Sequence, residues 1–429
     1  MKKYFKNLPK ELKIIISLAS QVSRETNMPA YLVGGFLRDL ILGVRNFDLD
    51  IAVEGNGIIF AQTLAKKLKS GLRTHERFGT ATLILDGFLK VDIATTRKEK
   101  YPSCACLPQV SCGPLKDDLM RRDFTINAMA ANIVDTGEQK LIDPFGGKDD
   151  LLAGRIRILH DLSFKDDPTR ILRAIRFEQR FNFKIEPKTL FLLKAAIKNG
   201  LLNRVSPHRI RDEFILMLKE PDFLKQIKRI NNLCSLSFIS NKLKVKKSTY
   251  DLFKSADKEI FWFNKNFPTH RQLDTWLIYF VALLVPLDLK EIRNITFRLG
   301  LRKGEEKIII SYRRLNRKLI QFLSKKSILP AQIFSKLEPL SYETIVLLRS
   351  SSQNKYLKDH ISNFLRIYNG MRLYVSGKDL AALGVLPGPG YQKIFAKVLE
   401  AKLNGKIKGR RQELVLIREL IKTKNLKGS

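Results

Sequence analysis

Two aspartates separated by one residue stand in an apolar run, Phe47-Asp48-Leu49-Asp50-Ile51. In an extended strand alternate residues share a face, so Asp48 and Asp50 project together while the apolar residues pack behind them. Two carboxylates on one face repel each other, and a divalent cation relieves that repulsion. Mg²⁺ usually binds one or two carboxylates together with substrate phosphates. The pair therefore predicts a magnesium site; the alternative is a solvated pair on an edge strand.

A glycine turn precedes this pair. The run Leu32-Val33-Gly34-Gly35-Phe36-Leu37-Arg38 predicts an apolar strand that ends in two glycines, followed by a helix. Glycines let backbone N–H groups approach a phosphate, and a helix N-terminus adds a favourable dipole. Arg38, one turn into the helix, can reach a phosphate oxygen. The turn is consistent with a phosphate site, although many such turns are only structural.

A third carboxylate, Asp92, lies in another apolar run, Lys90-Val91-Asp92-Ile93-Ala94. If this strand lies beside the strand of Asp50, Asp92 can join the metal site or act as the base for an attacking hydroxyl. A structural hydrogen bond is an equal alternative.

Further blocks of charged residues follow in the sequence. One block combines two adjacent arginines with an acid and a helix-like apolar run. It is Asp118-Leu119-Met120-Arg121-Arg122-Asp123-Phe124-Thr125-Ile126-Asn127-Ala128. This pattern suits a buried ion-pair network that also contacts a triphosphate. The later blocks are Asp143-Pro144-Phe145-Gly146-Gly147, Asp166-Asp167-Pro168-Thr169-Arg170-Ile171-Leu172-Arg173-Ala174-Ile175-Arg176-Phe177 and Ser206-Pro207-His208-Arg209-Ile210-Arg211-Asp212-Glu213.

The elements that must position these residues form a mixed α/β head. Residues 1 to about 28 read as an amphipathic helix with Leu12, Ile15, Ile16 and Ala19 on one face. From residue 31 to about 158, helices alternate with strand-like runs, and Asp86-Gly87 predicts a hairpin turn. The expected strands are Tyr31–Val33, Phe47–Val53, Ala81–Leu85, Phe88–Ile93 and Asn132–Val134.

After about residue 160 the pattern is almost entirely helical, as in Pro168–Phe181 and Pro207–Lys219. We therefore expect an α+β head followed by an elongated all-α neck, body and tail. The proposed bounds are 1–158 for the head, 159–220 for the neck, 221–370 for the body and 371–429 for the tail.

The formal charge is +36, from 78 Lys and Arg against 42 Asp and Glu. A polyanion partner explains such an excess, because neutralising phosphates releases counterions; a lysine-rich proteome is the alternative. No window approaches the length of a transmembrane helix, so we expect a cytoplasmic protein without a membrane partner. Cys104, Cys106 and Cys112 cluster without zinc-site spacing and have no assigned role.

In order, these blocks resemble the motifs of the class II tRNA nucleotidyltransferase and poly(A) polymerase family, within the DNA polymerase beta nucleotidyltransferase superfamily. The resemblance covers about residues 30–215, and it extends more weakly to Ser376-Gly377-Lys378-Asp379-Leu380 and the loop Pro387-Gly388-Pro389. It implies that nucleotide is bound by Gly34, Gly35, Arg38, Arg122, Asp123, Asn127, Asp167, Arg170, Arg173 and Arg176.

By this resemblance Asp167 and Arg170 select the base. At three residues apart on a helix they lie side by side. A carboxylate accepts a hydrogen bond from the exocyclic amine of cytosine or adenine, whereas uracil and guanine present a carbonyl there. Asp167 as a helix cap before Pro168 is the structural alternative. The family usually has Glu where Asp166 stands, and Arg209 and Glu213 are expected to brace the base-selecting helix.

The resemblance implies template-independent addition of C and A from CTP and ATP to the 3′ end of tRNA. We hypothesise that Asp48 and Asp50 hold two Mg²⁺ ions, that Asp92 is a further catalytic residue, and that the basic helices grip the acceptor arm. The alternatives are an A-adding, CC-adding or poly(A)-adding enzyme and, less consistent with the aspartates, a non-catalytic RNA-binding protein. A full-length loop from about Thr96 to Lys116 favours the ability to add A. The oligomeric state stays open.

Overall fold

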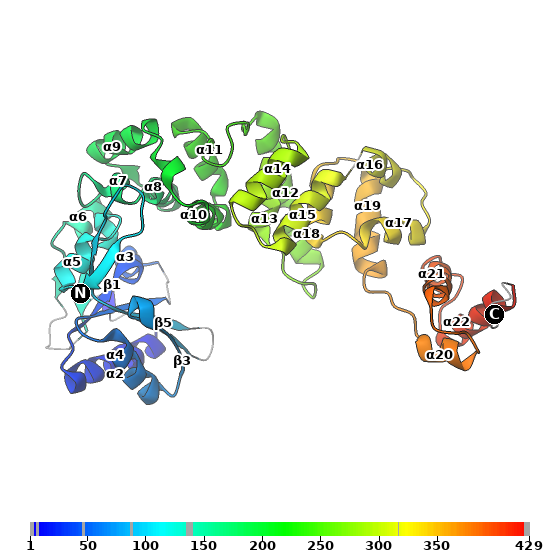
Figure 1. The fold of residues 1–429 in the computed structure, drawn as a ribbon, viewed down its shortest axis with the longest axis horizontal. Coiled ribbons are helices and arrows are strands. Elements are labelled where there is room, and N and C mark those ends of the chain that lie inside the picture. The colour runs from blue at the N-terminus through cyan, green and yellow to red at the C-terminus, as the bar shows by residue number, and fades with distance from the viewer. Residues whose placement is uncertain are drawn as a thin grey trace. The chain divides into compact units, whose positions relative to one another are not determined.

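The computed structural model describes residues 4–5, 8–44, 48–85, 89–133, 140–315 and 317–423. Its internal contacts divide the chain into two units, the residues up to Phe238 and those from Ile239 onward (Figure 1). All named strands lie in the first unit, and the second is helical in its described part. This confirms the predicted fold class, a mixed α/β head followed by helices. None of the described helices is long and apolar enough to cross a membrane.

The head is built on a seven-stranded mixed sheet. Only β2 and β5 pair in parallel; the other neighbours are antiparallel. In spatial order its strands are β3 (Gly71–His75), β4 (Thr80–Ile84), β5 (Lys90–Thr95), β2 (Leu49–Val53), β1 (Ala30–Val33), β8 (Ala130–Asn132) and β9 (Leu141–Ile142).

Four of the apolar runs predicted as strands are strands, and their alternation explains why. The strand predicted over Asn132–Val134 was placed too late, because β8 ends at Asn132. In β5 the side chains of Val91 and Ile93 are buried and those of Lys90 and Asp92 are exposed, as expected for a strand with one covered face. Strand β3 was not predicted, because its side chains are mostly exposed and no alternation marks it. Phe47, the Asp86-Gly87 turn with Phe88, and Val134 lie outside the described residues.

Among the described residues, helices that pack against strands of the sheet are α2 (Lys10–Thr26), α3 (Gly34–Leu42) and α4 (Gly57–Leu68). Helix α2 buries Leu12, Ile15, Ile16 and Ala19, the face that its sequence predicts. Helix α3 begins at Gly34, directly after β1, so the predicted strand–glycine–helix turn is confirmed.

Two sequence interpretations were wrong. Residues 96–116 are not simply a loop: β6 (Arg97–Lys100) and β7 (Gln109–Cys112) pair as an antiparallel hairpin, followed by α5 (Leu115–Met120). The apolar run after Asp123 is not a helix. It makes one 3₁₀ turn, η3 (Thr125–Asn127), and then enters β8, where Ala130 and Ala131 pair with residues of β1 and β9.

The helical part of the first unit confirms the predicted helices almost to the residue. Helix α8 (Thr169–Arg180) packs against α10 (Pro207–Lys219), with proline in the first turn of α10 where no N–H is required. The remaining elements are α6 (Gly147–Leu152), β10 (Arg155–Ile156), α7 (Ser163–Asp166), β11 (Lys184–Ile185), α9 (Pro187–Lys198), η4 (Leu201–Arg204) and α11 (Phe223–Leu233).

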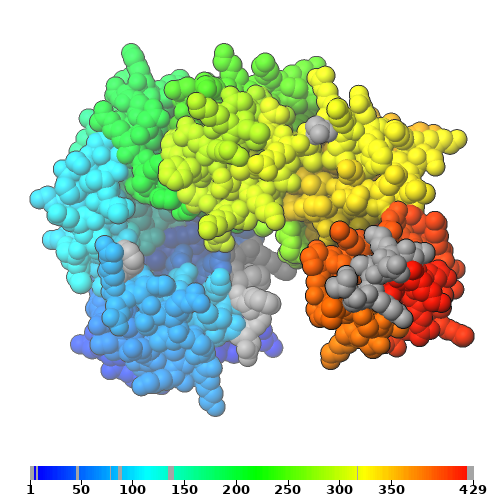
Figure 2. Space-filling model, turned by 45° about the vertical axis from the view of Figure 1, so that its right-hand side comes forward, coloured from blue at the N-terminus to red at the C-terminus, as the bar shows by residue number. Residues whose placement is uncertain are grey.

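The second unit consists of helices in two regions. The first runs through α12 (Lys247–Asn266), α13 (Thr275–Leu284), α14 (Leu289–Arg298), α15 (Lys303–Arg314), α16 (Arg317–Leu323), α17 (Pro330–Leu337), α18 (Tyr342–Ser350), α19 (Lys355–Asn363) and η5 (Phe364–Tyr368). The last helices, α20 (Gly377–Ala382), α21 (Pro389–Leu403) and α22 (Arg410–Thr423), share a separate apolar core around Leu380 and Val398 (orange to red in Figure 2). The division into head, neck, body and tail remains our proposal.

Candidate active site

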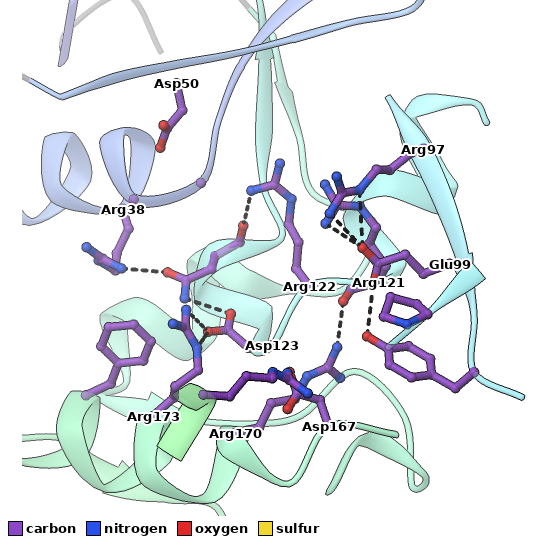
Figure 3. Close-up of a pocket in the computed structure, with 17 residues that line it drawn as sticks. Arg38, Asp50, Arg97, Glu99, Arg121, Arg122, Asp123, Asp167, Arg170 and Arg173 are labelled. Atoms are coloured by element: carbon purple, nitrogen blue, oxygen red, sulfur yellow. Dashed lines mark hydrogen bonds and ion pairs between the residues drawn. The ribbon is translucent and has the colours of Figure 1, made fainter. Parts of the chain in front are cut away.

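A cavity of about 480 Å³ opens in the first unit (Figure 3). Asp50 lies on one side of it, and Asp167 and Arg170 lie across from Asp50. The cavity brings together Gly34, Gly35, Arg38, Asp50, Arg97, Glu99, Tyr101, Pro108, Arg121, Arg122, Asp123, Asn127, Asp167, Arg170, Arg173, Phe177 and Arg209. Most of the residues expected to bind nucleotide are therefore in one place.

The glycine corner is sterically specified. Gly34 has a φ of +68°, which is costly for residues with a Cβ. A Cβ built there would lie 2.9 Å from Nη1 of Arg122 and 3.3 Å from Oδ2 of Asp50. Gly34 thus lets the backbone pass between a guanidinium and a carboxylate at the N-terminus of α3, an end of a helix that favours an anion such as phosphate.

Asp50 and Asp92 are directly opposite each other on the parallel strands β2 and β5. Burial raises the pKa of Asp50 to about 6; the carboxylates of Asp92 and Asp48 add to the rise, while Arg122 opposes it. The two strands lie side by side, which is the condition under which Asp92 can join a metal site with Asp50. Asp48 is exposed and stands just before β2, so the prediction that both aspartates lie within the strand was wrong for Asp48, because the strand begins at Leu49.

These carboxylates fit a divalent cation. A desolvated Asp50 next to two further carboxylates is unfavourable until positive charge is supplied. Among the described residues no group of three or more His, Cys, Asp or Glu side chains forms a complete cation site. Mg²⁺ needs fewer protein ligands than that, because phosphate oxygens and water complete its shell. For Asp92 both readings stay open, since it also accepts a hydrogen bond from the hydroxyl of Thr82.

Arg38 is buried, with 5% of its surface exposed. Its Nε donates to Asp39 at 2.8 Å and its Nη1 donates to Asn127 at 2.7 Å, while its guanidinium lies over the ring of Phe181, 4.7 Å from the ring centre. These contacts fix the guanidinium at the cavity wall. A preorganised arginine of this kind binds an oxyanion with little entropic cost.

The two adjacent arginines share one buried acid. Asp118, on α5, accepts from Arg121 at 2.7 Å and from Arg122 at 2.9 Å. Although burial acts to raise it, the two guanidinium groups hold the pKa of Asp118 below its usual range. The predicted buried ion-pair network is therefore present, and it aims Arg122 at the glycine corner.

A second network ties the head to α8. Asp123 accepts from Arg173 at 2.6 and 2.8 Å and from Asn127 at 2.9 Å. Against the effect of burial, Arg173 and Asn127 hold the pKa of Asp123 at about 2. Because Asn127 also accepts from Arg38, one chain of hydrogen bonds links Arg38 to Arg173.

Asp167 and Arg170 both line the cavity but differ in local structure. Arg170 is on α8, and its guanidinium donates to the Ser163 hydroxyl at 2.6 Å and to the Arg121 carbonyl at 2.7 Å. Asp167 is extended and precedes α8, so the expectation that the pair lies side by side on the helix was wrong. Its carboxylate accepts from the Thr169 backbone N–H, as a capping residue does. Asp167 therefore caps α8 and lines the cavity with the same side chain.

The remaining members of the series lie as follows. Arg176 does not line the cavity; it is buried in an ion pair with Glu213 at 2.7 Å. Arg209 pairs with Asp167 at 2.7 Å. Both Arg209 and Glu213 come from α10, which agrees with the bracing role expected of them. Oδ2 of Asp166 lies 3.8 Å from Nε2 of His160, and Asp166 does not line the cavity.

Sequence reasoning missed the hairpin's contribution. Arg97, Glu99 and Tyr101 line the cavity, and Glu99 accepts hydrogen bonds from Arg97, Arg121 and Tyr101. Burial and the charge of Glu99 raise the pKa of the Tyr101 hydroxyl. The spacing Arg97-Lys98-Glu99-Lys100-Tyr101 places these side chains on one face of β6 and its continuation, and this alternation was the available signal.

The cysteines form no disulfide, and Cys104, Cys106, Cys112 and Cys234 are free thiols. The Sγ of Cys106 donates to the Ser103 carbonyl at 2.9 Å, which stabilises a turn between β6 and β7. No catalytic role follows from this placement.

Comparison with known proteins identifies related families. Residues 30–157 match the poly A polymerase head domain, and residues 182–233 match the probable RNA and SrmB-binding site of polymerase A. The A-adding tRNA nucleotidyltransferase of Geobacter sulfurreducens is 35% identical over 414 residues. That alignment covers 95% of this chain and 47% of the relative, so the chain spans about half the length of this curated relative.

Solved structures agree over nearly the whole chain. A CCA-adding enzyme in its apo form II is 34% identical with a TM-score of 0.78, and the match covers 98% of both chains. The CCA-adding enzyme of Thermotoga maritima, solved in complex with tRNA, is 32% identical with a TM-score of 0.71 and the same coverage.

Proposed function

Because this chain belongs to the tRNA nucleotidyltransferase and poly(A) polymerase family, we propose that it adds C and A nucleotides from CTP and ATP to the 3′ end of tRNA, releasing pyrophosphate. One observation carries the proposal: a single cavity holds a phosphate-type corner at Gly34 and Asp50 and an acid–arginine pair at Asp167 and Arg170. A nucleoside triphosphate carries phosphates at one end and a base at the other, so it matches both parts of the cavity. Its base can then be read by side chains, without a nucleic-acid template.

At the phosphate end, Arg38 and Arg122 neutralise triphosphate charge from fixed positions. Asp50 and Asp48, with Asp92 beside them, would hold Mg²⁺. When bound, the ion polarises the phosphate and lowers the pKa of the attacking 3′-hydroxyl. Gly34 keeps this corner open for the triphosphate.

At the base end, Asp167 accepts from the exocyclic amine of cytosine or adenine, and Arg170 donates to the neighbouring ring nitrogen. Uracil and guanine would set a carbonyl oxygen against the carboxylate and leave it unpaired, which a buried site penalises strongly. The +36 charge and the complex of the Thermotoga neighbour support the tRNA acceptor arm as the second substrate.

The product is tested with a ladder experiment. Purified protein is incubated with tRNA ending before the tail, after one C or after two, and with CTP alone, ATP alone or both. We expect two C additions with CTP, one A on the tRNA ending in two C, and the full tail with both nucleotides. Long A tracts would indicate a poly(A) polymerase, and no extension of any tRNA would refute the proposal.

Addition of the terminal A alone is the second candidate, because the Geobacter relative carries that name. It predicts extension only of tRNA that already ends in two C. In that case CTP would produce no ladder with any substrate, although ATP would still be incorporated.

A further inference from the structure

The carboxylate of Asp167 is held by three donors. Its Oδ1 accepts from the backbone N–H of Thr169 at 3.0 Å and from the Thr169 hydroxyl at 2.6 Å. Its Oδ2 accepts from Nη2 of Arg209 at 2.7 Å. Thr169 is in the first turn of α8 and is buried, whereas Arg209 comes from α10. Two elements therefore fix the plane of this carboxylate before any nucleotide arrives.

The three donors leave different numbers of acceptor positions free on the two oxygens of the Asp167 carboxylate. A carboxylate oxygen accepts about two hydrogen bonds, one along each lone pair. Within the described part of the chain, Thr169 fills both acceptor positions of Oδ1, and Arg209 fills one of Oδ2. A single acceptor position on Oδ2 remains for the cavity that Asp167 lines. One N–H group, such as the exocyclic amine of cytosine or adenine, satisfies it.

We infer that Thr169 is a positioning residue for base selection, an inference that rests on the proposed function. Its hydroxyl keeps Oδ1 occupied, so that Asp167 meets the base through Oδ2 alone. Without the hydroxyl, Oδ1 regains an acceptor position and the carboxylate can turn. It can then accept from the ring N–H next to the carbonyl of uracil, which the held carboxylate does not reach. Discrimination against UTP falls, while use of CTP and ATP persists.

The test compares Thr169→Val, which replaces the hydroxyl by a methyl, with Thr169→Ser, which keeps it. The measured quantity is the ratio of kcat/KM for UTP to that for CTP on the same tRNA. If the protein adds only A, GTP and ATP replace this pair, because guanine also presents a ring N–H beside a carbonyl. Losing one hydrogen bond to a charged group corresponds to about tenfold or more. We expect the ratio to rise about tenfold in Thr169→Val and to stay at the wild-type value in Thr169→Ser.

Thr189→Val is the matched control, because Thr189 is also buried, its hydroxyl accepts from the Ile158 N–H, and it does not line the cavity. It should leave the ratio unchanged. If Thr169→Val fails to fold, Thr169→Ala deletes the same hydroxyl. An unchanged ratio in the variant lacking the hydroxyl, or an equal rise in Thr189→Val, would overturn the inference alone. Wild-type protein that incorporates neither CTP nor ATP would instead overturn the proposed function, and the inference with it.

Discussion

Asp50 and Asp92 occupy paired positions on two parallel strands, with Gly34 at the adjacent corner. The sheet thus assembles acidic groups from segments about forty residues apart, and it does so beside two arginines. Such clustering of like charge has no benefit for stability, because burial and neighbouring carboxylates make ionised Asp50 unfavourable. The cost is consistent with a site adapted to bind a cation and triphosphate.

The destabilisation of the fold by ionised Asp50 can be measured without nucleotide. Burial raises the pKa of Asp50 to about 6 in the folded protein from its ordinary value of 3.8, so the ionised carboxylate destabilises the fold above pH 6 and the effect fades as the pH falls toward 4. In EDTA, Asp50→Asn should therefore have a higher Tm than wild type at pH 7.5, with the difference shrinking by pH 5. Thermal melts at both pH values check this, with exposed Asp212→Asn as control. A difference independent of pH would count against the assignment.

Substitution of Gly34 by Ala should abolish most activity. The added Cβ would lie too close to Arg122 and Asp50, and the alanine would also have to adopt a positive φ. Gly43→Ala is a matched control, because Gly43 has a φ of +70° but nothing within 4 Å of its Cβ position. We expect both variants to lose about 1 kcal/mol of unfolding free energy. Only Gly34→Ala should lose nucleotide incorporation, by about 100-fold or more. Equal activities of the two variants would show that the corner does not contact the reacting phosphates.

Asp123→Asn should destabilise the first unit. The substitution leaves the partly buried guanidinium of Arg173 without its main partner, and losing a hydrogen bond between charged groups costs about 2 kcal/mol. The pKa of Asp123, about 2, lies below its usual value, so its stabilising effect is present above pH 4 and is lost as the pH falls toward 2. Urea unfolding at pH 7 measures the loss. A cost no larger than that of Asp212→Asn would mean that the pair contributes little.

Arg209→Met, which removes the donor, should act through the same carboxylate as the Thr169 hydroxyl. Each substitution frees an acceptor position of Asp167, so each should raise UTP use relative to CTP. Because both act on one group, the effects in the double variant should depart from additivity by about 0.5 kcal/mol or more. A double-mutant cycle on the kcat/KM ratios provides the value. Strict additivity would indicate that Arg209 affects selection by another route.

Local patterns were sufficient to predict much of this site. The glycine turn, the apolar strands and the amphipathic helices have short-range signatures, so β1, α3, β5, α8 and α10 were predicted close to their observed positions. The pairing of β2 with β5 could only be considered as a condition, because nothing in the sequence fixes which strands adjoin.

Contacts between residues that are far apart in the sequence could not be predicted from local patterns. Nothing near Arg38 in sequence indicates that Asn127 will hold its guanidinium, and nothing near Asp123 points to Arg173. Strand β6 is charged and β7 is exposed, so the hairpin lacks the apolar alternation that marks a buried strand. Its contribution through Glu99 and Tyr101 depends on tertiary packing. Asp167 precedes α8 and caps it, which is the structural alternative that Pro168 had indicated.

The most direct test of the account is single-turnover incorporation of labelled ATP into tRNA ending in two C, measured with wild type, Asp50→Asn and the control Asp212→Asn over a range of Mg²⁺ concentrations. We predict that Asp50→Asn is slower by about 1000-fold at every Mg²⁺ concentration, while Asp212→Asn matches wild type. An Asp50→Asn protein that incorporates label within tenfold of the wild-type rate would contradict the assignment of this corner as the site of phosphoryl transfer.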